Sequence, residues 1–67
     1  MTYKILHIDN QMVAARLLVL GIYPGKTIEL VRKAPFGGAC YVRVDQAFYV
    51  LRRQEWDSII KQELAGS

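Results

Sequence analysis

Residues 16–35 read R-L-L-V-L-G-I-Y-P-G-K-T-I-E-L-V-R-K-A-P, and they join a helix end, a turn and a strand without a linker. The apolar helical pattern ends before Gly21, whose missing Cβ suits a left-handed C-terminal cap, and Ile22 follows where such a cap returns an apolar side chain to the last turn. Residues 23–26, Y-P-G-K, have the proline and glycine of a type II turn. Residues 27–33 alternate apolar and polar side chains, as a half-buried strand does. The stretch predicts a short helix attached directly to a strand of a small barrel.

Working outward from this stretch, the chain adds further short strands separated by tight turns. Asp9 or Asn10 caps the start of the helix, since either short side chain reaches the free N–H groups of the first turn. Five strands and one helix inserted after the first strand predict a mainly β fold, a small and strongly bent barrel. The predicted strands are 2–8, 27–33, 40–45, 48–51 and 59–62, the helix runs from its cap to Leu20, and a helical turn covers 52–56. The expected core is Ile5, Val13, Leu17, Leu18, Leu20, Ile22, Ile28, Leu30, Val42, Val44, Leu51 and Ile59.

Length and composition predict a single domain over residues 1–67, with a loose tail at 64–67. A composition of 52% apolar and 22% charged residues excludes a disordered chain. The longest apolar stretch, residues 12–22, is interrupted by Arg16 and spans eleven residues, well short of the roughly 20 that cross a bilayer. We therefore expect no direct membrane insertion. The single cysteine and the absence of a signal-peptide pattern at residues 1–9 predict a cytoplasmic protein.

The helix is apolar on both sides. Its outward side carries Met12, Ala15, Arg16 and Val19, of which only Arg16 is polar. A helix that is apolar all round is usually buried all round, which a 67-residue domain cannot achieve alone. Either a few exposed apolar side chains are tolerated, or this side of the helix contacts another chain.

Side chains suited to catalysis or metal binding are few. His7 and Cys40 lie on different predicted strands, whereas structural zinc takes four ligands and catalytic zinc three. Cys40 is more simply a small buried residue. The carboxylates Glu29, Asp45, Glu55 and Asp57 show no spacing that selects an acid/base pair, and we interpret them as solvated strand and turn residues. We predict no catalytic residue, metal site or cofactor, and hence a binding module rather than an enzyme.

Three blocks of sequence together resemble the ferrous iron transport protein A family, FeoA. They are R-L-L-x-L-G-I-x-P-G at Arg16–Gly25, A-P-F-G-G at Ala34–Gly38 and L-R-R-x-E at Leu51–Glu55. The resemblance covers residues 3–61 and implies an SH3-like barrel with a helix after the first strand. It also implies a small cytosolic accessory of FeoB, the membrane transporter of Fe(II) with a GTP-hydrolysing domain. Val19 departs from the family, in which this position is commonly polar.

We therefore predict docking on the FeoB transporter. Met12, Arg16 and Val19 are the expected contacts on the helix, and Pro35 and Phe36 form a second contact at a hairpin tip. Arg16 supplies a charge-assisted hydrogen bond beside apolar anchors, a frequent composition of interface hot spots.

Other classes of function stay open at this point. A net charge of +3 raises the alternative of a small basic barrel that binds nucleic acid, although base-stacking aromatics and a dense basic face are not obvious. Self-association through an unpaired strand edge is a further alternative, and Fe(II) sensing through His7, Cys40 and acidic side chains is a weaker one. The residues expected to contact nucleic acid are Arg32, Lys33, Arg43, Arg52 and Arg53.

Overall fold

The computed structural model describes residues 1–64. Its elements confirm the predicted mainly β fold with a helix after the first strand. The expected tail at 64–67 is wrong for Leu64, whose N–H donates to the Thr2 carbonyl at 2.9 Å; residues 65–67 lie outside the described part. The elements are β1 (Thr2–Ile8), α1 (Gln11–Val19), β2 (Thr27–Lys33), the short 3-10 turn η1 (Pro35–Gly37), β3 (Ala39–Val44), β4 (Ala47–Arg52), α2 (Arg53–Ser58) and β5 (Ile59–Glu63).

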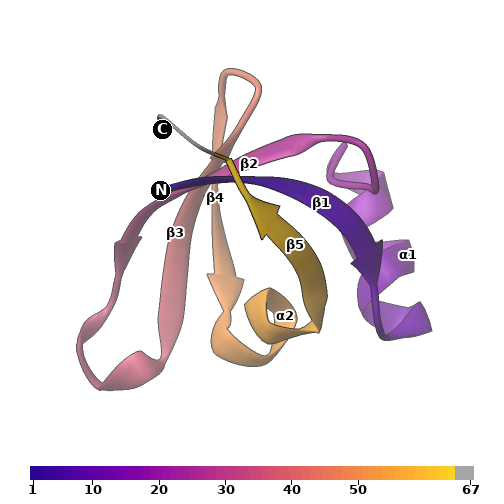
Figure 1. The fold of residues 1–67 in the computed structure, drawn as a ribbon. Coiled ribbons are helices and arrows are strands. Elements are labelled where there is room, and N and C mark those ends of the chain that lie inside the picture. Colours follow the sequence, from indigo (N-terminus) through magenta and orange to yellow (C-terminus); the bar gives the residue numbers. More distant parts are fainter. Residues whose placement is uncertain (65–67) are drawn as a thin grey trace.

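The five strands form one antiparallel sheet in the order β4-β3-β2-β1-β5. The register shifts between Ile5 and His7 in β1 and between Leu30 and Arg32 in β2. Such bulges bend a strand and increase its twist. The sheet accordingly curls, with β1 crossing over the other strands, into the SH3-like barrel of Figure 1. Helix α1 lies to one side of this barrel, and α2 lies below it between β4 and β5.

The start of α1 is capped by Asn10 rather than Asp9. The Asn10 Oδ1 accepts the N–H groups of Met12 at 3.0 Å and of Val13 at 3.1 Å, and the backbone of Asn10 is extended, as an N-cap requires. Two of the four free N–H groups at the start of the helix are thereby satisfied.

The end of α1 confirms the predicted glycine cap. Gly21 has φ +86° and its N–H donates to the Leu18 carbonyl at 3.0 Å, while the Ile22 N–H reaches the Leu17 carbonyl at 2.9 Å. These two bonds are the Schellman pattern, and the side chains of Leu17 and Ile22 are fully buried together. The turn that follows closes through the Lys26 N–H to the Tyr23 carbonyl at 3.1 Å, with Gly25 at φ +96°. Helix α1 is therefore fixed to β2 by local geometry at every step.

The core fills the inside of the curled sheet. Leu18 and Leu20 were expected there, and this prediction is wrong, because they are 59% and 41% exposed. Leu17 is the buried residue of α1, and only Val13 and Ala14 join it against the core. The helix thus meets the barrel along one narrow stripe. Leu18 points away from this stripe, because each residue is rotated by about 100° around the helix axis from the one before it, here Leu17. The buried apolar residues are Ile5, Ile8, Leu17, Ile22, Ile28, Cys40, Val42, Val44, Leu51, Trp56 and Ile59.

Candidate protein-interaction site

The outer face of α1, which we define as Met12, Ala15, Leu18 and Val19, is exposed along the whole helix. The side chains of Met12 and Val19, both predicted contacts, are 84% and 86% exposed. Leu18 enlarges this face beyond the sequence prediction, since it lies outside the core. Clustered apolar side chains of this kind mark interaction surfaces more often than single exposed residues do.

Arg16 lies at the border of this face and is held by an ion pair. One guanidinium nitrogen is 2.7 Å from Glu55 Oε2, and the Arg16 side chain is 59% exposed while that of Glu55 is 5% exposed. The other carboxylate oxygen of Glu55 accepts the Arg52 N–H at 2.8 Å and so caps α2. The interpretation of Glu55 as a solvated residue is therefore wrong, because the carboxylate is buried between two donors. A guanidinium has five N–H donors, so Arg16 keeps donors that face solvent.

The second predicted contact, Pro35 and Phe36, forms the tip of the β2–β3 hairpin. The Gly37 N–H donates to the Ala34 carbonyl at 3.3 Å, which places Phe36 at the third position of a tight turn with φ +67°. This left-handed conformation normally takes glycine and costs other residues about 1–2 kcal/mol. The Phe36 side chain is fully exposed.

The structure does not bring the two groups of predicted contacts together. In Figure 1 the β2–β3 hairpin lies at the lower left and α1 at the far right of the barrel. Met12, Arg16 and Val19 therefore share one surface, while Pro35 and Phe36 project from another. A single flat interface cannot include both.

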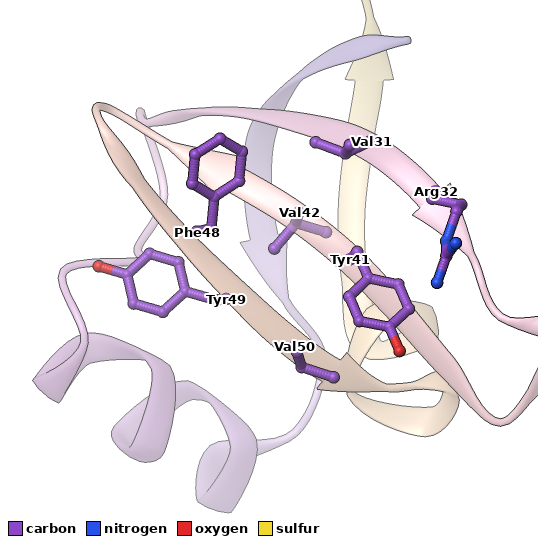
Figure 2. A pocket seen from close by; sticks show the side chains of 7 residues that line it. All are labelled: Val31, Arg32, Tyr41, Val42, Phe48, Tyr49 and Val50. Atoms are coloured by element: carbon purple, nitrogen blue, oxygen red, sulfur yellow. The ribbon is translucent and has the colours of Figure 1, made fainter.

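A shallow groove of about 330 Å³ on the outer side of β2, β3 and β4 was not predicted. Figure 2 shows Tyr41, Phe48 and Val50 along it, with Arg32 beside Tyr41. Phe48 is 70% and Val50 61% exposed, and the Arg32 guanidinium lies 4.9 Å from the centre of the Tyr41 ring. The signal in the sequence was residues 48–51, F-Y-V-L, which are apolar on both sides of a strand and not only on the core side.

The model of the FeoA domain matches residues 2–61, almost the whole chain. The chain belongs to the FeoA family. No curated protein and no solved structure is significantly similar to it. FeoA domains are small accessory domains of ferrous iron transport and are not known as enzymes. The ion pair of Arg16 with Glu55 joins the first and third sequence blocks by which the chain resembles this family.

The five residues of this FeoA domain that were expected to contact nucleic acid lie in two places. Arg43 pairs with Glu29 at 2.7 Å on the central strands. The other four residues expected to contact nucleic acid lie toward the β2–β3 hairpin, because Lys33 is opposite Cys40 and Arg52 is opposite Ala39 in the sheet register. These five residues therefore do not form one continuous basic face.

Residues with metal-binding side chains stay apart in residues 1–64. His7 is exposed on β1 and Cys40 is buried on β3, and the described residues contain no group of three or more His, Cys, Asp or Glu side chains that could hold a metal ion. Asp45 accepts a hydrogen bond from Lys26 Nζ at 2.7 Å, which raises the pKa of that lysine.

Among residues 1–64, no helix has the length and hydropathy needed to cross a membrane.

Proposed function

We propose that this FeoA domain docks on the cytoplasmic part of the FeoB ferrous iron transporter through the outer face of α1, and thereby modulates the assembly or the nucleotide cycle of the transporter. The exposure of Met12 and Val19, 84% and 86%, carries the proposal. Family membership supports an accessory role in ferrous iron transport, and an accessory protein needs a surface for its partner.

The way α1 is held makes it a suitable docking element. The two ends of the helix are fixed by the Asn10 cap and the Schellman motif, and its inward side is fixed by the buried Leu17. The Arg16–Glu55 ion pair fixes the helix to α2. A surface that is already ordered loses little conformational entropy on binding. The outward apolar side chains then supply buried area, and the free donors of Arg16 supply a polar contact beside them.

Pro35 and Phe36 remain the second proposed contact. Because the hairpin tip lies on the other side of the barrel from α1, we place its contact with the surroundings of the transporter and not with the part that covers the helix.

A pull-down of the detergent-solubilised transporter tests the role of α1. Val19→Asp places a charge on the outer face at the C-terminal end of α1, and it is expected to weaken binding by about 2 kcal/mol, roughly thirtyfold. Val50→Asp is the matched control, because Val50 is also an exposed valine, 61% exposed, but lies in the β4 groove. Unchanged melting temperatures of both variants show that the fold is intact.

Equal recovery of the transporter by wild type and Val19→Asp would exclude the helix face. Loss of binding in Val50→Asp alone would assign the contact to the groove instead.

A further inference from the structure

Cations surround the hairpin tip. Lys33 ends β2, Arg52 and Arg53 stand where β4 passes into α2, and all three side chains are exposed. Arg53 lies close to the tip, since a Cβ added at Gly37 would come within 3.3 Å of its guanidinium. We call Phe36, Lys33, Arg52 and Arg53 the tip cluster. Asp57 offsets one of the three positive charges through an exposed pair with Arg53 at 3.2 Å, whereas Glu55 is buried against Arg16.

The shape of the tip cluster is convex. The Phe36 ring is fully exposed, is held outward by a left-handed backbone, and is not among the residues that line the groove. An exposed ring of this kind is suited to a membrane surface, where the ring enters the boundary between headgroups and acyl chains while nearby cations contact lipid phosphates.

We propose that the tip cluster binds the anionic lipid surface of a membrane, with Phe36 at the level of the headgroups. Charge complementarity supports this occupant, because each Lys or Arg close to an anionic bilayer strengthens binding about fivefold. The contact is peripheral, so it requires no membrane-spanning segment. The inference deepens the proposed function by giving the chemistry of its second contact, because a domain bound to a membrane transporter lies close to lipid.

Nucleic acid fits the tip cluster less well. Sequence-tolerant binding of nucleic acid combines a basic groove with aromatic faces for stacking. Here Tyr41 is covered by Arg32 at 4.9 Å, and Arg43 is engaged with Glu29 away from the tip. Nucleic acid is therefore an outcome of the test rather than the proposal.

Co-sedimentation with vesicles tests the charge requirement. The full chain is expected to bind vesicles of equal parts phosphatidylglycerol and phosphatidylcholine, to bind phosphatidylcholine vesicles much more weakly, and to be released by salt. The double variant Lys33→Gln/Arg53→Gln should bind about twentyfold more weakly. Lys4→Gln/Arg43→Gln is the matched control, since it also removes two exposed charges, one of them from an ion pair.

The control pair should bind almost as wild type does. If it loses as much binding as the tip pair, the attraction belongs to the net charge and the proposal is wrong. Absence of binding to the anionic vesicles also overturns it.

A second variant tests the aromatic ring. Phe36→Gly removes the ring and suits the backbone φ of +67°, so it should fold at least as well as wild type and bind anionic vesicles about tenfold more weakly. Phe36→Trp should regain the binding, and its fluorescence should be quenched by brominated lipids beyond any change in the buried Trp56. Undiminished binding by Phe36→Gly would contradict the proposed role of the ring.

The two proposals fail separately. In detergent without a bilayer, Phe36→Gly should still recover the transporter, whereas Val19→Asp should not. With vesicles that lack the transporter, Val19→Asp should still bind, whereas binding of Phe36→Gly should be weakened. A duplex DNA or an RNA oligonucleotide that binds more tightly than the vesicles, through Lys33 and Arg53, would overturn the lipid assignment in favour of nucleic acid.

Discussion

The two sides of α1 have similar side chains and opposite surroundings. Leu17 is fully buried, whereas its neighbour Leu18 is 59% exposed and Val19 is 86% exposed. The inward stripe packs against the curled sheet, and the outer face has nothing above it in residues 1–64. The difference shows that an apolar side chain on a helix is buried only where a neighbouring surface covers it. On α1 the surface of the barrel covers one side alone.

Leu17→Ala provides the strongest test of this difference. Truncation of a fully buried leucine leaves a cavity and is expected to destabilise the fold by about 3 kcal/mol, measured by urea denaturation. Val19→Ala is the matched control on the outer face and should change the free energy of unfolding by less than about 0.5 kcal/mol. Similar losses in both variants would mean that α1 is covered on both sides.

Glu55→Ala tests the attachment of α1 to the rest of the fold. It removes the cap of α2 and the ion-pair partner of Arg16, and we expect a loss of about 2 kcal/mol. Asp57→Ala also removes a carboxylate of α2 that pairs with an arginine, but both side chains of that pair are exposed. This substitution should therefore lower the free energy of unfolding by less than about 0.5 kcal/mol. An equal effect of the two variants in denaturation would show that the burial of Glu55 has no energetic consequence.

Glycine substitutions extend the comparison to the hairpin tip. They should change the free energy of unfolding in opposite directions at the tip and on the outer face of α1. Phe36→Gly is expected to stabilise the fold by about 1 kcal/mol, because it relieves the left-handed strain. Val19→Gly should destabilise it by up to about 1 kcal/mol, because glycine is a poor helix former. Thermal unfolding measures both. A lower melting temperature of Phe36→Gly would indicate that the ring makes stabilising contacts.

The smallest effect concerns pH and the buried side of the barrel. Burial lowers the pKa of Lys61 from its usual 10.5, although its Nζ donates to the carbonyls of Trp56 and Ile59. Between the lowered pKa and 10.5 the unfolded chain holds more protons than the native one, so stability contributed by this group rises with pH in that window. Lys61→Met should remove this part of the slope in denaturation midpoints measured across the window. An unchanged slope would show that Lys61 does not titrate abnormally.

Local signals predicted the fold well. Asn10, Gly21 and the turn at residues 23–26 act through neighbours a few residues away, so their roles are visible in the sequence. The strand boundaries followed from alternation and turn residues in the same way, to within one residue at each end.

The failures all depend on distant partners. Leu18 and Leu20 were placed in the core because periodicity does not report how wide a surface the barrel offers. Glu55 was placed in solvent because its burial depends on Arg16, which belongs to another element. The groove beside Val50 was missed because three strands create it together. The outward direction of Met12 and Val19 was predictable, since it follows from helical spacing alone.

The ion pair between α1 and α2 limits how far this domain can be simplified. Replacing α1 with a short loop looks straightforward for an engineer who wants a minimal barrel, because α1 is an insertion between two adjacent strands. The shortened protein would remove the counter-charge of the Glu55 carboxylate and would leave a hole in the core at the position of Leu17. A workable miniature would therefore need a neutral residue at position 55 and a bulkier side chain to close the gap.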